Sequence, residues 1–261
     1  MIKLAIVQAN DLGIAKNIET IANFAHKAAS CGCNAICFPE AFLTGYNLKT
    51  AEVTAIKSDN DAIKTVSNIA QKFSLDILTG FIERSENKLY ITHGVFYSDG
   101  KTDFYRKTHL GKRECEVFSH GDTLPVFTLN CGIKAAVSLC LESHFNDIIQ
   151  TLSLKGAKVI FAPHAAPHSA EKRISLWQKI IPARSYDNRV YIACCNICEK
   201  ETKGGCLVTD PNGDIIGSVS DNEPELLCFE VDKSLLNRLR DNNQNHHFSF
   251  YPPLRRKNLF Q

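Results

Sequence analysis

Short apolar runs alternate along the chain with segments whose apolar residues recur at helical spacing. The first run, Leu4–Val7, is followed by residues 18–29, in which the apolar positions fall on one face of a helix. Ala35–Phe38 is the next apolar run. Runs of this length predict buried strands, and their alternation with helices predicts an α/β fold.

The same alternation continues as far as residue 194. Residues 62–73 carry a helical pattern and precede the apolar run Ile77–Phe81. Two further strand-helix-strand units are predicted, one from Ala135–Leu139 through residues 148–152 to Val159–Phe161, and one from there through a helix around Trp177 to Val190–Cys194.

Two other segments predict hairpins. Between Lys88 and Tyr105, two extended runs are separated by Ser98-Asp99-Gly100, and Asp210–Asp214 separates two more. Gly, Asn and Asp favour tight turns between antiparallel strands. The sheets are therefore expected to mix parallel and antiparallel strands.

Composition favours one large domain. The chain has 261 residues, of which 44% are hydrophobic and 22% charged, so it can bury a large core. No linker or internal repeat stands out. We expect a single domain over residues 1–261, in which residues 241–261, with their polar residues, aromatics and Pro pair, form a C-terminal arm rather than a helix.

Charge and cysteine content exclude several classes of protein. The net charge of +2 comes from Lys and Arg scattered among Asp and Glu, without a basic stripe for nucleic acid. Met1–Gln8 meets a polar residue too early for a signal-peptide core, and no apolar run reaches the roughly 18 residues of a membrane span. The eleven cysteines are odd in number and lie mostly in apolar segments, which favours reduced thiols. We expect a cytoplasmic protein with no nucleic-acid or membrane partner.

Three reactive side chains, Glu40, Lys107 and Cys140, follow directly on predicted strands. Because α/β folds gather strand ends at one sheet edge, the three could converge. A thiol beside a carboxylate and a lysine can attack an amide, since its neighbours can take its proton, stabilise an oxyanion and protonate the leaving amine. Each residue also has an ordinary explanation: Glu40 as a solvated loop charge, Lys107 as a surface cation and Cys140 as a small buried hydrophobe.

Other polar residues are weaker candidates. Cys195 and Cys198 have Cys-x-x-Cys spacing, but no second pair accompanies them and the segment matches a buried strand, so we expect no metal site. His144, His164 and His168 follow predicted strands, where they could either line a pocket or be solvated loop side chains.

Three motifs carry a resemblance to a known family. Phe38–Tyr46 resembles the PExxxTGY motif of the nitrilase superfamily, Tyr105–Leu110 resembles its YRKxHL motif, and Ser138–Phe145 resembles its nucleophile motif, in the family order. Weaker matches cover the rest of the chain: Lys155–Ala157, Ala183–Asn188, Asp210–Gly213 and Arg255-Arg256.

The resemblance implies a four-layer α-β-β-α sandwich and a second glutamate near the lysine. Glu114 stands four residues before Phe118, as the family glutamate usually stands before its aromatic, and Glu116 is a competing candidate. The chain departs from the family pattern at His120, at Asn146-Asp147 and at Leu141, which replaces the usual aromatic. These changes remove no reactive group.

By the same resemblance, Cys140 is the nucleophile, Glu40 the general base, and Lys107 with the backbone N–H of Leu141 holds the oxyanion. Leu141, His144 and His164 are the expected substrate-binding residues. The expected reaction hydrolyses a small linear amide through a Cys140 thioester, without a cofactor. N-carbamoyl-amine hydrolysis, nitrile hydrolysis and a catalytically silent binding protein of the same fold are the alternatives.

The resemblance also predicts an assembly. Protomers are expected to pair through helices as a homodimer or larger homo-oligomer. The helix around Trp177 and the C-terminal arm are the candidate interface.

Overall fold

The strands pair in two groups that are joined at one short contact. The structure, a computed structural model, describes residues 2–199 and 202–240. Its strands are β1 (Ile2–Asn10), β2 (Ala35–Cys37), β3 (Asp76–Ser85), β4 (Lys88–Phe96), β5 (Thr102–Arg106), β6 (Phe127–Thr128), β7 (Lys134–Val137), β8 (Val159–His164), β9 (Tyr191–Cys198), β10 (Cys206–Thr209), β11 (Ile215–Val219) and β12 (Glu225–Val231). One group has the order β5-β4-β3-β2-β1-β12 and the other β6-β7-β8-β9-β10-β11, and the ends of β1 and β9 join them.

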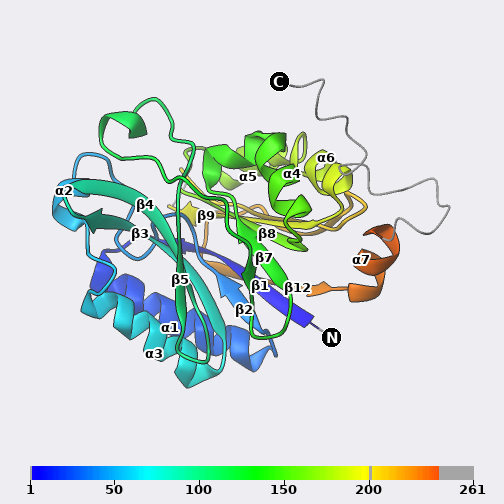
Figure 1. Cartoon of the computed structure of the whole chain (residues 1–261), viewed down its shortest axis with the longest axis horizontal. Coiled ribbons are helices and arrows are strands. Elements are labelled where there is room, and N and C mark those ends of the chain that lie inside the picture. The colour runs from blue at the N-terminus through cyan, green and yellow to red at the C-terminus, as the bar shows by residue number, and fades with distance from the viewer. Residues whose placement is uncertain (1, 200–201, 241–261) are drawn as a thin grey trace.

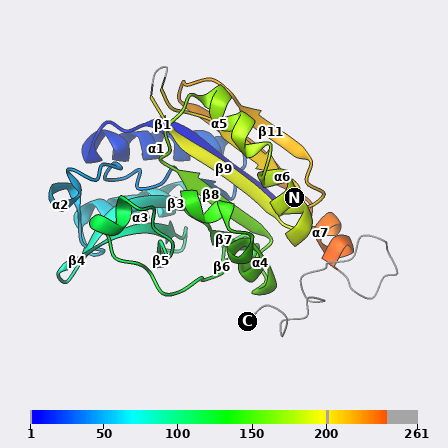
Figure 2. The same ribbon diagram turned by 90° about the horizontal axis from the view of Figure 1, so that it is seen from above.

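Helices cover the outer face of each group. The described helices are α1 (Ile14–Ser30), α2 (Ala51–Thr54), α3 (Asp61–Phe73), α4 (Asn146–Leu154), α5 (Ala170–Trp177), α6 (Ile181–Asn188) and α7 (Lys233–Arg240), with the 3₁₀ helices η1 (Glu114–Glu116) and η2 (Cys140–His144), and five of them cover the outer faces. Apolar residues of α1 and α3 pack on β1, β2 and β3. Those of α4, α5 and α6 pack on β7, β8 and β9 (Figures 1 and 2).

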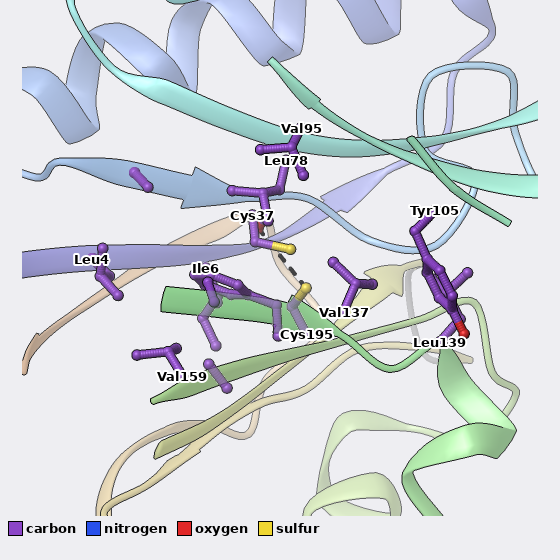
Figure 3. Packing of buried hydrophobic residues seen from close by; sticks show 14 of the residues in the cluster. Leu4, Ile6, Cys37, Leu78, Val95, Tyr105, Val137, Leu139, Val159 and Cys195 are labelled. Carbon is purple, nitrogen blue, oxygen red and sulfur yellow. Dashed lines mark hydrogen bonds between the residues drawn. The ribbon is translucent and has the colours of Figure 1, made fainter. Parts of the chain in front are cut away.

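The alternation of side chains along each strand creates the layers. Leu4 and Ile6 of β1 belong to the core between the two sheets, whereas Ala5 and Val7 face α1 and α3. Figure 3 shows the inner core, where Cys37 of β2 lies beside Cys195 of β9. Because successive residues of a strand point to opposite faces, each inner strand serves two apolar cores. The layers are helices, sheet, sheet, helices, and the predicted four-layer α-β-β-α sandwich is confirmed.

The predicted connections agree with the strand pairing. β1, β2 and β3 pair in parallel, as do β7, β8 and β9. The two predicted hairpins are antiparallel, β4 with β5 and β10 with β11. The sequence pattern did not predict β12, which pairs antiparallel with β1 from Ile2 to Gln8. This strand contains the apolar run Leu226–Phe229, but most of its residues are exposed or only partly buried.

The helix around Trp177, which is expected at an interface between protomers, is α5. Trp177 is fully buried, so only the exposed face of α5 is open to another protomer. The C-terminal arm, residues 241–261, lies outside the described residues. Among the helices that the structure describes, none is long and apolar enough to cross a membrane.

Candidate active site

The ends of β2, β5 and β7 bring the three reactive residues to one edge of the sandwich. Lys107 directly follows β5, and its Nζ donates hydrogen bonds of 2.8 Å to Glu40 Oε1 and 2.8 Å to Glu114 Oε1. The side chains of Lys107 and Glu40 are each 1% exposed. The readings of Glu40 as a solvated charge and of Lys107 as a surface cation are therefore wrong.

The structure distinguishes the two candidate glutamates. Glu114 is buried in η1, where its carboxylate also accepts hydrogen bonds from the Tyr46 hydroxyl at 2.5 Å and the Gly111 N–H at 2.6 Å. Glu116 is exposed to solvent. Of the two glutamates, Glu114 is therefore the one that contacts Lys107. Tyr46 is a further member of the site. In the sequence it stands at the end of the PExxxTGY-like motif, which does not by itself predict its contact with Glu114.

Cys140 begins η2 in a strained backbone conformation. Its φ of 48° lies in the left-handed region that side chains other than glycine rarely adopt. Cys140 as a whole residue is only partly buried. Among the described residues no group accepts a hydrogen bond from the Leu141 N–H, which follows at the start of η2. A nucleophile and a free backbone donor therefore lie next to each other.

A second strained turn carries Glu40. Ala41, the next residue, has a φ of 51°, and its backbone packs against Gly80 of β3. A Cβ at Gly80 would collide with the Ala41 backbone nitrogen. The glycine therefore lets the turn after β2 lie directly on β3.

Glu142 connects the lysine loop to the nucleophile turn. This fully buried carboxylate accepts hydrogen bonds from the Tyr105 hydroxyl at 2.7 Å, the Thr108 N–H at 2.8 Å and the Leu139 N–H at 2.7 Å. Figure 3 shows Tyr105 and Leu139 at the same end of the core. Glu142 lies inside the nucleophile motif Ser138–Phe145, and the sequence alone does not predict its contacts.

The charges around Lys107 determine how the site is protonated. Burial would lower the pKa of Lys107, but the nearby acidic groups, Glu40 foremost, outweigh it and hold that pKa above its usual range. Burial likewise opposes ionisation of Glu114, yet contact with Lys107 brings its pKa below the usual value. The site therefore contains a charged lysine beside an ionised glutamate.

The other two groups of the site, Glu40 and Cys140, have raised pKa values. Burial raises the pKa of Glu40, and Lys107 offsets part of this rise while Glu114 adds to it. Burial and the negative charge of Glu40 raise the pKa of the Cys140 thiol to about 12, although Lys107 opposes the shift. At neutral pH Cys140 is a thiol, and a base must take its proton before it attacks.

The three predicted substrate-binding residues occupy different environments. Leu141 is partly buried and His144 is exposed, both in η2 beside Cys140. His164 is buried at the end of β8, where one ring nitrogen lies 2.7 Å from the Ala162 carbonyl oxygen. Burial lowers the pKa of His164 to about 3, so its ring is neutral. The solvated-loop explanation is wrong for His164, and it fits His168, which is exposed.

A cavity of about 480 Å³ lies beside the charged cluster. Its lining includes Tyr46, which bonds Glu114, and Ala165, whose N–H donates to Glu40 Oε2 at 3.2 Å. Within the described ranges, no group of three or more His, Cys, Asp or Glu side chains is arranged to hold a metal ion. Cys195 and Cys198 are both buried within β9.

Comparison with known sequences places the chain in a family. Residues 3–241 match the model of the carbon-nitrogen hydrolase family. A nitrilase of Pyrococcus abyssi is 29% identical over 259 residues, which span 95% of this chain and 96% of that protein. The omega-amidase NIT2 of Xenopus tropicalis is 27% identical, over 87% of this chain and 86% of its own length.

Solved structures have the same fold. An amidase from Nesterenkonia sp. has a TM-score of 0.80 at 22% identity, over 92% of this chain and 93% of that one. A variant of the amidase from Nesterenkonia sp. AN1 in complex with butyramide has a TM-score of 0.83 at 21% identity, over 99% and 95% of the two chains. The chain therefore belongs to the carbon-nitrogen hydrolase family and is an enzyme of the nitrilase superfamily.

Proposed function

We propose that this enzyme hydrolyses small linear carboxamides to a carboxylic acid and ammonia through a thioester on Cys140. The observation that carries the proposal is the placement of Lys107 between Glu40 and Glu114, with all three charges acting on the Cys140 thiol. This arrangement supplies a nucleophile, a base and a cation, the three groups that acyl transfer from an amide needs.

In the first half-reaction Glu40 takes the thiol proton while the Cys140 sulfur attacks the amide carbon. Lys107 and the Leu141 N–H stabilise the negative charge that develops on the carbonyl oxygen. The C–N bond then breaks, and Glu40 returns its proton to the leaving ammonia. The raised pKa of Glu40 suits a group that accepts and donates a proton in turn.

In the second half-reaction water replaces ammonia. Glu40 takes a proton from water as the oxygen attacks the thioester, and the same two donors hold the new oxyanion. The C–S bond breaks, the carboxylic acid leaves, and the proton on Glu40 returns to the Cys140 sulfur. Glu114 orients Lys107 throughout, because the Lys107 ammonium group donates hydrogen bonds to both Glu114 and Glu40.

Amides are preferred over the other substrates of the superfamily. Relatives of the chain include omega-amidases, and the butyramide complex is that of an amidase. In another structure of that amidase, acrylamide is joined to the active-site cysteine. The short Leu110–Arg113 connection disfavours N-carbamoyl amines, since carbamoylases of the superfamily often carry an insertion there. Nitrile hydrolysis is the second candidate, because the relative from Pyrococcus abyssi bears the name nitrilase.

A substrate panel tests the proposal. Purified enzyme is assayed for ammonia release from linear amides, ω-amides, N-carbamoyl amines and nitriles, with Cys140→Ala as the matched control. We expect release from amides at the highest rate and none from the control. Release from nitriles or carbamoyl amines alone would replace the amide proposal, and no release from any class would support a silent binding protein.

A further inference from the structure

Two cysteines that are far apart in the sequence have their sulfur atoms in contact. Cys33 precedes β2, and Cys228 lies in β12, 195 residues later. The Cys33 thiol donates a hydrogen bond of 3.5 Å to the Cys228 sulfur. Cys33 is 7% exposed and Cys228 is half-buried. Both are free thiols, so the pair can lose two hydrogen atoms and form a covalent bond.

Strand β1 holds the backbone of both cysteines. Directly after Cys33, the Asn34 N–H donates a 2.7 Å hydrogen bond to the Lys3 carbonyl oxygen of β1. On the β12 side of the same strand, Cys228 pairs with Ala5. Because one strand fixes both residues, the contact of their sulfurs is a property of the fold rather than of one loose side chain.

Another close pair of cysteines is sealed in the core between the sheets. The Cys195 thiol donates to the Cys37 carbonyl oxygen at 3.8 Å, and both residues are 0% exposed (Figure 3). An oxidant dissolved in water does not reach them in the folded protein. The pair formed by Cys33 and Cys228 differs, because one of its members is open to solvent.

A cation near both sulfurs favours their reaction. Burial raises the pKa of the Cys228 thiol, and the charge of Lys3 acts against this rise. Burial also raises the pKa of the Cys33 thiol to about 12, where Lys3 again opposes the shift. The thiolate is the species that attacks an oxidant, so Lys3 increases the share of the reactive form at each sulfur.

We propose that Cys228 and Cys33 form a redox-modification site, which hydrogen peroxide oxidises to a disulfide. The Cys228 sulfur attacks one peroxide oxygen, the O–O bond breaks, and Cys228 becomes a sulfenic acid as one water leaves with the thiol proton. The Cys33 sulfur then attacks the Cys228 sulfur, the S–O bond breaks, and a second water carries away the oxygen and the Cys33 proton. Two thiols are oxidised, and one peroxide is reduced to two waters.

The disulfide changes how β12 is held. Among the described strands β12 pairs only with β1, and the new bond also ties it to the segment between α1 and β2. The two sulfurs move from 3.5 Å to about 2.0 Å apart, which β12 accommodates by a small shift. Closing a loop of 195 residues restricts the unfolded chain, so the oxidised protein is the more stable form.

The pair lies away from the catalytic cluster. Cys33 precedes β2 and Glu40 follows it, so the disulfide forms at the opposite end of that strand. The inference therefore does not rest on the proposed amidase function.

Mass spectrometry of the full-length Cys140→Ala protein tests the inference without interference from the catalytic thiol. The protein is treated with hydrogen peroxide, its remaining thiols are blocked with iodoacetamide, and it is digested without reduction. We expect a cross-linked pair of peptides that joins Cys33 to Cys228 with the loss of two hydrogen atoms, and its disappearance after treatment with dithiothreitol. Cys31→Ser, which removes an exposed thiol close by, should leave the cross-link unchanged, and the sealed core pair should stay reduced.

Thermal unfolding measures the effect of the bond. The oxidised Cys140→Ala protein should melt about 5–15 °C above its reduced form, and Cys228→Ser in the same background should show no such rise. A Cys228 thiol that survives peroxide, ends as a sulfinic acid or pairs with Cys31 would overturn the inference, and a cross-link without a rise would overturn its stabilising effect. The mapping uses unsubstituted Cys33 and Cys228, so a folding defect of the Ser variant would leave the test intact.

Discussion

At the scale of single residues, Lys107 determines the chemistry of the site. Its ammonium group bonds both Glu40 and Glu114, so the cluster contains two carboxylates for one cation. The second carboxylate counteracts the effect of the lysine on the Cys140 thiol, whose pKa burial and Glu40 raise to about 12. The nucleophile is therefore protonated at neutral pH, and its activation depends on proton transfer to Glu40.

Glu114→Gln and Lys107→Met should change thiol reactivity in opposite directions. Glu114 raises the pKa of Cys140 and Lys107 lowers it. At a fixed pH the first variant should react faster with iodoacetamide and the second slower, by about tenfold for each unit of pKa. Peptide mass spectrometry would follow alkylation of Cys140. A change in the same direction for both variants would contradict the assigned charges.

The pH dependence of turnover should reflect Glu40. Its pKa lies above the ordinary 4.5, and the base works only when it is ionised. Activity should therefore disappear as the pH falls through that raised value, with an acid limb above pH 4.5 in kcat/KM. Removing Glu114 lowers the pKa of Glu40, so the residual activity of Glu114→Gln should extend to lower pH. An acid limb that stays in place in this variant would argue against Glu40 as the titrating group.

The sequence predicted the reactive residues better than their partners. Glu40, Lys107 and Cys140 stand in recognisable motifs after apolar runs, and the spacing to Phe118 favoured Glu114. Glu142 escaped assignment because its role depends on how the lysine loop folds over the nucleophile turn.

At the scale of elements, three strand ends and one buried carboxylate assemble the site. Glu142 in η2 holds the segment after β5 and the segment after β7 together, so Lys107 and Cys140 keep their relative positions. β12, in contrast, was not predicted although it contains the apolar run Leu226–Phe229, because its antiparallel partner β1 lies far away in the sequence and no local helix or turn pattern indicates that pairing. Local pattern therefore predicts buried parallel strands well and a half-exposed antiparallel partner poorly.

Glu142→Gln should weaken both the fold and catalysis. The substitution removes a charge that accepts several buried hydrogen bonds and places an amide N–H₂ where two donors now point, so we expect a loss of about 2–4 kcal/mol in the free energy of unfolding. The turnover number should fall about tenfold or more because the lysine loop moves relative to Cys140. Urea unfolding and the amide assay measure the two effects. Glu171→Gln, at an exposed position of α5, is the control, and equal behaviour of both variants would contradict the bridging role.

At the scale of the whole molecule, helices lie on the outer faces of two sheets (Figure 1), and the site lies where strand ends of both sheets meet. Strand ends from both sheets meet there, since Glu40 and Lys107 come from one and Cys140 from the other. Neither sheet alone carries a complete site. Packing of the inner core between the sheets is thus a condition for activity as well as for stability.

Protomers should associate in solution. We expect sedimentation equilibrium to give a mass of at least twice 29.1 kDa at micromolar concentrations. Substitutions on the exposed face of α5, such as Lys172→Glu, should weaken the association if this helix contributes to the interface. A mass of 29.1 kDa throughout the concentration range would contradict the expected homo-oligomer.

The proposed mechanism requires a thioester on Cys140, and the Glu40→Gln variant allows this intermediate to be detected most directly. The variant keeps the shape of the side chain but cannot activate water, so turnover should slow by about 10²–10⁴. An activated butyryl ester does not need a proton on its leaving group, and loss of the Glu40 charge lowers the pKa of the Cys140 thiol, so the ester should still acylate the enzyme, although more slowly than the wild type. Intact-protein and peptide mass spectrometry should then find one butyryl group on Cys140, and none after Cys140→Ala. An adduct on any other of the eleven cysteines, or normal formation and hydrolysis of the adduct in Glu40→Gln, would contradict the account.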